Sequence, residues 1–257
     1  MNDGMKKSII VVVLGLCIAN AANAQGRCQY KVDEIDETDG AGVLKSTGRP
    51  VTGTVCSYHG NHAVNVEMPF RDGKKEGIAR YYFESGELWK EAPYEGNVLE
   101  GVEKRYYEGG MLEAECPYEN GRQEGLSKWY HENGNLWRET PFEDGRHEGV
   151  TRHYYEDGRL WWETPYRYGI VDGIERWYYR SGRLQEEFSF KNGKQEGYRQ
   201  LYAEDGRLLI KLLYRNGNPV GGACGDGRKL DGAEVKNWLD AGKATPCAPQ
   251  DEPRQAQ

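Results

Sequence analysis

The sequence predicts an all-β fold: an elongated single-layer antiparallel β-meander of hairpin repeats of about 24 residues, capped by a short C-terminal helix. One observation is the strict spacing of glycines, which continues from Gly53 to Gly221 without an insertion or a deletion. Another is the alternation of apolar and polar residues between these glycines, which is typical of strands. A strict period of this length indicates a repeat architecture, in which each unit packs only against its neighbours.

One unit, Gly125 to Glu148, illustrates the predicted hairpin. Residues 126–131 alternate as a strand, and residues 132–134 form a turn in which Gly134 can adopt a positive φ. Residues 135–142 form the return strand, and residues 143–146 form a second turn that leads to the next hairpin. About seven such units predict a meander of short strands.

Two registers are possible for each hairpin. Residues 24 positions apart occupy equivalent places in successive repeats, and each such set forms a column along the sheet. A three-residue turn with a glycine bulge places Tyr130 opposite Leu136 and puts the Leu126, Tyr130, Leu136 and Phe142 columns on one face. A two-residue turn instead places Lys128 opposite Glu139 and divides these columns between the faces. Burial of an aromatic or leucine side chain is worth about 1.5–3 kcal/mol, whereas an exposed ion pair is worth about 0.2–1 kcal/mol. The larger contribution favours the bulged register.

In the bulged register the opposite face combines aromatic side chains with the recurring glutamates. Such a mixture resembles a protein-recognition surface. The alternative is that these rings only cover the sheet and stack along the array. The partner-binding residues predicted on this face are Trp89, Trp129, Trp137, Trp161, Trp177, Tyr155, Tyr179, Glu139 and Glu163.

The repeat resembles the MORN repeat variant found in bacterial proteins. The resemblance rests on the order of turn glycines, Tyr, Leu and terminal Glu-Gly in strings such as WYHENGNLWRETPFEDGRHEG and RYYEGGMLEAECPYENGRQEG, and it covers residues 49 to 221. It implies a scaffold that contacts protein or lipid, and more specifically an antitoxin-like or immunity-like protein. The first unit departs from the pattern, because His62 stands at the position of its central turn glycine.

The N-terminus predicts export. Lys6 and Lys7 precede a short apolar run, and Ala22-Asn23-Ala24 is a small-residue cleavage site before Gln25. This pattern predicts a signal peptide, residues 1–24, and therefore a periplasmic or secreted protein. A lipid anchor at Cys17 is disfavoured, because Leu16 stands where a small residue is expected.

The cysteines divide between the two ends of the array. In an oxidising compartment most of them should pair, and we expect disulfides Cys28–Cys56 and Cys224–Cys247. Cys116 is left over, and we interpret it as a small buried side chain rather than as a reactive thiol.

The remaining segments complete the predicted organisation. Residues 25–48 form an acidic N-terminal cap segment, 49–221 the repeat array, 222–247 a disulfide-bounded helical cap, and 248–257 a disordered tail. Residues 230–241 predict a helix, with Asp231 and Glu234 as a capping box. We expect this helix to cover the open edge of the last hairpin.

The composition argues against several classes of function. The net charge of −7 disfavours non-specific binding to nucleic acid or to an anionic membrane. The histidines lack metal-ligand spacing, and no nucleophile stands in a catalytic motif. We therefore expect no enzyme, no metal and no cofactor. The main hypothesis is an exported inhibitor of a toxin, and the alternative is an envelope scaffold that contacts lipid or peptidoglycan.

Overall fold

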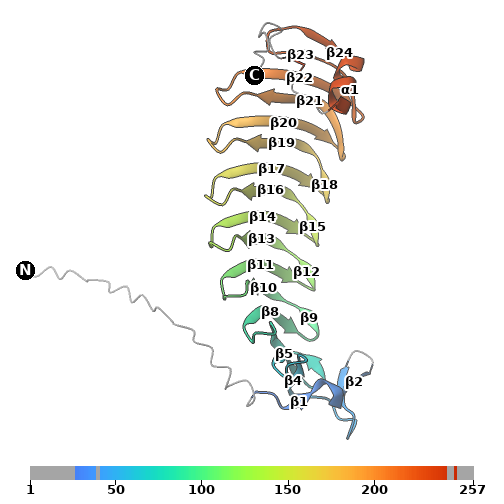
Figure 1. Cartoon of the computed structure of the whole chain (residues 1–257). Coiled ribbons are helices and arrows are strands. Elements are labelled where there is room, and N and C mark those ends of the chain that lie inside the picture. Colours follow the sequence, from blue (N-terminus) through green and yellow to red (C-terminus); the bar gives the residue numbers. More distant parts are fainter. Residues whose placement is uncertain (1–26, 39–40, 242–245, 248–257) are drawn as a thin grey trace, which may run out of the picture.

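The computed structural model describes residues 27–38, 41–241 and 246–247. The predicted signal peptide, its cleavage site and the predicted tail lie outside these residues. The described chain forms a long ladder of stacked hairpins with a small cap at each end (Figure 1). The predicted fold class is confirmed.

Within the described residues, seven long hairpins follow one another along the ladder, and each pairs with the next. They are β4 (Gly53–Tyr58) with β5 (Val64–Arg71), β7 (Gly77–Tyr82) with β8 (Leu88–Glu95), β10 (Gly101–Tyr106) with β11 (Leu112–Glu119), β13 (Gly125–Tyr130) with β14 (Leu136–Glu143), β16 (Gly149–Tyr154) with β17 (Leu160–Arg167), β19 (Gly173–Tyr178) with β20 (Leu184–Lys191), and β21 (Lys194–Tyr202) with β22 (Leu208–Arg215).

Short strands and caps complete the fold. The short strands that connect hairpins are β6 (Lys74–Lys75), β9 (Val98–Leu99), β12 (Arg122–Gln123), β15 (Arg146–His147) and β18 (Ile170–Val171). The N-terminal cap contains β1 (Tyr30–Lys31), the 3-10 helix η2 (Val32–Glu34), β2 (Ile35–Thr38) and β3 (Ala41–Leu44). The C-terminal cap contains β23 (Asn218–Cys224), β24 (Lys229–Asp231) and the helix α1 (Gly232–Ala241).

Both turns of the repeat need a left-handed backbone. Gly134 in the first turn has φ of 83°, and His62 takes the same role in the first hairpin with φ of 68°. In the second turn Asp144 and Gly145 have φ of 50° and 75°, which is the pattern of a type I′ turn. The first hairpin therefore keeps the repeat geometry although it lacks the glycine.

The two residue pairings that distinguish the possible registers occur together in the same hairpin. Tyr130 lies opposite Leu136, and Lys128 lies opposite Glu139, because the register shifts between Trp129 and Tyr130. Trp137 is the extra residue of this bulge. The same shift occurs in all seven long hairpins, so the expectation that the two pairings exclude each other is wrong.

The bulge gives the sheet two distinct faces. The charged face carries Leu126, Lys128, Tyr130, Leu136 and Glu139 together with the equivalent residues of the other repeats. The tryptophan face carries residues equivalent to Ser127, Trp129, Arg138, Thr140 and Phe142, together with the bulge residue. The prediction that all four recurring columns share one face is therefore wrong, since the Phe142 column lies opposite the other three.

The large buried apolar side chains of the described residues lie where the caps pack on the first and last long hairpins, and not along the middle of the array. One cluster contains Val51, Val55 and Phe70, and the other contains Ile210, Leu212, Tyr214, Cys224, Leu230 and Val235. Between the caps, the buried column on the tryptophan face holds small or polar residues such as Ala92, Cys116, Ser127 and Thr140. The middle of the array is therefore one layer thick.

The predicted disulfides are both present. Cys28 and Cys56 are joined in the N-terminal cap, and Cys224 and Cys247 in the C-terminal cap. Cys116 is a buried free thiol, as expected, and burial raises its pKa. Two disulfides are consistent with an extracellular or periplasmic protein.

The helix differs from its prediction in position. Its capping box is confirmed, because the Glu234 backbone N–H donates to Asp231 and the Asp231 N–H donates to Glu234. It starts at Gly232, however, because residues 229–231 form β24, which supplies the edge strand. Val235 packs with Ile210 and Leu212, so the helix covers a face of the last strands rather than their open edge. The free energy gained by burying this apolar face of the helix is larger than the gain from covering the backbone of a three-residue edge strand.

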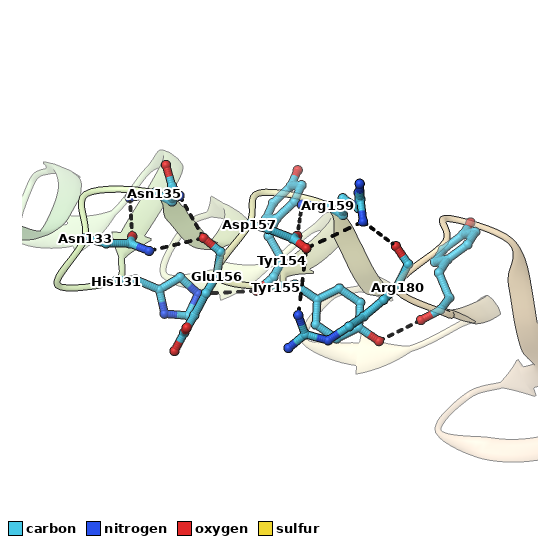
Figure 2. A network of polar contacts seen from close by, with 10 residues as sticks. His131, Asn133, Asn135, Tyr154, Tyr155, Glu156, Asp157, Arg159 and Arg180 are labelled. Carbon is cyan, nitrogen blue, oxygen red and sulfur yellow. Dashed lines mark hydrogen bonds and ion pairs between the residues drawn. The ribbon is translucent and has the colours of Figure 1, made fainter.

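Side chains join successive hairpins along both long edges of the ladder. On one edge the turn residues bond to the next turn: Asn135 donates to the Glu156 carbonyl and Tyr155 to the Tyr178 carbonyl (Figure 2). On the other edge the glutamate that precedes the first glycine of a hairpin accepts from the backbone of the next second turn, as Glu124 does from Asp144; the same bond is made by Glu76, Glu100, Glu148 and Glu196. The recurrence of these glutamates therefore has a structural cause.

A test of the glycine positions compares two alanine substitutions. Gly173 has φ of 126°, and an added Cβ would lie 2.9 Å from Cγ of Pro165. We expect Gly173→Ala to lower the free energy of unfolding by about 1–3 kcal/mol in urea denaturation. Gly60→Ala should change it by less than about 0.5 kcal/mol, because a Cβ there has no neighbour within 4 Å. Equal effects would contradict the steric argument.

Candidate recognition surface

A row of stacked side chains runs along the centre of the tryptophan face. The guanidinium of Arg138 lies 3.7 Å from the centre of the Trp129 ring. His153 stacks on Trp162 with ring centres 3.8 Å apart, and Trp162 stacks on Trp177 at 5.0 Å. The register places these residues on adjacent strands, so each ring supports the next. Such cross-strand contacts stabilise a sheet that has no second layer.

The bulge residues add a second, more exposed line of tryptophans. Trp89 is 39% exposed and Trp137 is 36% exposed. Trp161 packs edge-on against Trp162 and Trp177, and Tyr155 stacks on Trp161 at 5.3 Å. A bulge turns an extra side chain out of the regular alternation, and it therefore presents large rings at the surface.

The structure brings together most of the residues that the sequence singles out. The tryptophan face holds Trp89, Trp129, Trp137, Trp161, Trp177 and Tyr155. Tyr179, 24 residues after Tyr155, donates its hydroxyl to the Tyr202 carbonyl at the turn edge of the ladder. Glu139 and Glu163 lie on the charged face instead, where each accepts a hydrogen bond from a tyrosine hydroxyl, Tyr154 and Tyr178 respectively. The prediction that the glutamates share the face of the tryptophans is wrong, because the bulge changes the parity of the return strand.

Arg138, a residue of the central row, is missing from the predicted site. A signal for it exists in the sequence. The column that contains Arg138 holds Lys90, Ala114, Trp162, Glu186 and Ile210 in other repeats, whereas the adjacent Tyr and Leu columns scarcely change. A position whose residue type varies between the repeats of one chain is not constrained by the repeat scaffold, and it is therefore available for recognition.

The charged face is internally neutralised. Acidic and basic side chains alternate from strand to strand in a continuous register: Glu67, Arg80, Glu91, Lys104, Glu115, Lys128, Glu139, Arg152, Glu163, Arg176 and Glu187. Arg152 and Arg176 each contact two glutamates within 3.4 Å. Because most of these charges contact an opposite charge or a tyrosine hydroxyl, this face offers less to a second protein than the tryptophan face does.

The caps bound the tryptophan face at both ends. At the C-terminal end, Ile210 follows in the same row as Trp177 through Glu186 and Leu201, and α1 covers it. At the N-terminal end, a pocket of about 370 Å³ opens on this face. Its lining includes Ile35, Val55, Val66, Met68, Phe70 and Tyr81. The open stretch of the tryptophan face therefore lies between two capped ends.

Burial affects the ionisation of the central row. Desolvation, and after it the charge of Arg138, lower the pKa of His153 to about 4. Desolvation also lowers the pKa of Arg138. His153 is therefore a neutral ring at neutral pH, which suits its stacking on Trp162.

This shift predicts a pH dependence of stability. The folded-state pKa of His153 lies below the ordinary value of about 6.5, so folding opposes its protonation, and stability is lost as pH falls from about 6.5 to 4. His153→Phe keeps an aromatic ring over Trp162 and removes this titration. We expect the fall in Tm between pH 7.5 and pH 5 to be smaller in the variant than in the wild-type protein. An equal or larger fall in the variant would contradict the assignment.

Comparison with protein families supports the repeat type. Residues 75–95, 99–120, 123–144 and 171–192 match the MORN repeat variant. The β16–β17 hairpin is outside these matches, yet it has the same register and bulge as the matched hairpins. A search of curated proteins finds no match. The chain thus carries repeats of a type that serves as a binding scaffold.

Two further observations concern the described residues. No group of three or more His, Cys, Asp or Glu side chains among them is arranged to hold a metal ion. Within the same ranges, no helix has the length and apolar character needed to cross a membrane.

Proposed function

We propose that this chain is a scaffold that binds a protein partner through the tryptophan face. The observation that carries the proposal is the open stretch between the caps, where the exposed bulge residues Trp89 and Trp137 share a face with a stacked aromatic row. Tryptophan, tyrosine and arginine are the side chains that most often dominate the energy of protein interfaces. The tryptophans of the described array are concentrated on one face of a sheet whose other face pairs most of its charges internally.

A stable, extended scaffold favours binding by surface complementarity over catalysis. The stacked row holds its rings in place before binding, which reduces the entropy lost on association. The net charge of −7 and the predicted export support a protein partner over an anionic membrane. The more specific form of the proposal is that the partner is a toxin in the same compartment, which the chain inhibits by covering its active site. The resemblance of its repeats to the MORN repeat variant, which implies an antitoxin-like or immunity-like protein, supports this form.

Site-specific photo-crosslinking tests the proposal in the source cells. The photoreactive residue benzoylphenylalanine replaces Trp137 on the tryptophan face in one variant and Leu126 on the charged face in another. Both positions are similarly exposed. We expect one cross-linked protein from position 137 and none from position 126. Cross-linking from position 126 alone, or from neither position, would contradict the proposal.

The toxin hypothesis needs a separate measurement. The partner identified by cross-linking, once purified in its free form, should lose its toxic or enzymatic activity when an equimolar amount of the chain is added. A partner that is bound but keeps full activity would leave the scaffold function intact and exclude the inhibitor.

A further inference from the structure

Arg138 differs from the other partly buried arginines of the sheet. Within the described ranges, six arginines on strands are half-buried: Arg80, Arg105, Arg138, Arg152, Arg176 and Arg199. Five of them contact a carboxylate, as Arg105 contacts Glu103 at 2.8 Å and Arg176 contacts Glu187 at 2.9 Å. Arg138 contacts none in this part of the chain, and its Nε is buried without a hydrogen-bond partner.

The acidic groups of the tryptophan face are engaged elsewhere. Glu103 contacts Arg105 and Lys90, and Glu186 contacts Arg199. Glu175 accepts hydrogen bonds from Thr164 and from the indole of Trp177. The positive charge of Arg138 therefore remains uncompensated on its own face, although the chain as a whole is acidic.

The surroundings of Arg138 hold its guanidinium ready for a ligand. The guanidinium carbon lies 3.7 Å from the centre of the Trp129 ring and 5.3 Å from that of Trp137, so two aromatic rings lie beside the group. Next to it, Nδ1 of His153 and Oγ1 of Thr151 are also buried without a partner. A half-desolvated cation beside unpaired polar atoms costs free energy, and an incoming anion recovers that cost.

We propose that Arg138 receives an aspartate or glutamate side chain of the protein partner on the tryptophan face. This inference rests on the proposed function and names the chemistry that the partner must supply. A guanidinium binds a carboxylate through two parallel hydrogen bonds, and removal of water strengthens this pair. The adjacent histidine is neutral, so a single positive charge is offered, which matches a carboxylate better than a phosphate dianion. Trp129 and Trp137 provide apolar contact for the residues beside that carboxylate.

The test uses a phage-displayed library of random peptides, selected on the immobilised full chain with its disulfides intact. Selected peptides are synthesised, and their affinity is measured by calorimetry for the wild-type chain and three variants. Arg138→Met keeps an aliphatic stem over Trp129 and removes the charge. Arg146→Met removes an exposed arginine of β15 and serves as the matched control. Trp137→Ala combined with Trp161→Ala removes the exposed rings.

We expect the selected peptides to share one acidic position. Replacing that residue by its amide should weaken binding to the wild-type chain by about 30-fold or more, the usual scale for breaking a buried charge pair. Arg138→Met should weaken binding equally and abolish the difference between acid and amide, whereas Arg146→Met should have little effect.

Other outcomes separate this inference from the proposed function. Peptides that need Trp137 and Trp161 but bind equally to Arg138→Met would overturn the role of Arg138 and leave the tryptophan face as the binding surface. Peptides that bind all the variants equally, or a selection without enrichment, would count against both.

Discussion

Leu212→Ala should lower the free energy of unfolding by about 2–5 kcal/mol, the range measured for leucine truncation in a packed core. Leu212, on the last long strand β22, is fully buried beneath the C-terminal cap, among Ile210, Leu230 and Val235. Truncation removes its contacts with these neighbours and leaves a cavity under α1. Urea denaturation of the full chain, followed by tryptophan fluorescence and by circular dichroism, measures the change.

Leu126→Ala is the matched control for this prediction. It is the same substitution in a β-strand, but Leu126 is 43% exposed on the charged face. We expect a loss of less than about 1 kcal/mol, because little apolar surface leaves water at this position. If the two variants lost equal stability, the stability of the array would not be concentrated in its caps.

Replacing Cys224 and Cys247 together by serine should cost about 2–5 kcal/mol, the usual range for removal of a native disulfide. The bond joins β23 to the segment that follows α1 across a sequence separation of 23 residues, and both cysteines pack with the cluster of Leu212. Without the bond the helix can leave the face that it covers. The tryptophan face would then gain an exposed apolar end.

Two measurements check the disulfide prediction. The Tm of the double variant should fall, and binding of a dye specific for exposed apolar surface should rise below the main transition. Cys116→Ala removes the free thiol and should change stability by less than about 1.5 kcal/mol. A double variant as stable as the wild-type chain would show that packing alone holds the cap.

The repeat and its turns could be predicted from the sequence because they depend on local chemistry. Positive φ at positions such as Gly134 and Gly145 restricts the residue type, and the spacing of these positions fixes the hairpin length. The disulfide pairs could be predicted because each pair brackets one end of the array. These features require no knowledge of how one hairpin meets the next.

The division of side chains between the two faces could not be predicted in the same way. A single extra residue, Trp137 in its hairpin, shifts the parity of every residue that follows on the strand. Alternation in the sequence is equally compatible with both parities. For this reason the sequence places Glu139 and Glu163 with the tryptophans, whereas the structure has them on the opposite face.

Arg138 illustrates a second limit. Its column varies among repeats, but the sequence does not show which basic residues have an acidic neighbour. That information comes from the register, which places Lys128 beside two glutamates and Arg138 beside Trp129 and His153. A charge without a partner becomes visible only when the faces are known.

The central claim is that the tryptophan face binds the partner. Its most direct test is calorimetric titration of the free partner, identified by cross-linking, against the wild-type chain and two variants. Trp137→Ala with Trp161→Ala alters the tryptophan face, and Tyr198→Ala removes a tyrosine that is 48% exposed on the charged face. We predict that the first variant weakens binding by about 30-fold or more, corresponding to about 2 kcal/mol, and that the second changes it by less than about twofold. A large loss with Tyr198→Ala and none with the tryptophan variant would contradict the claim.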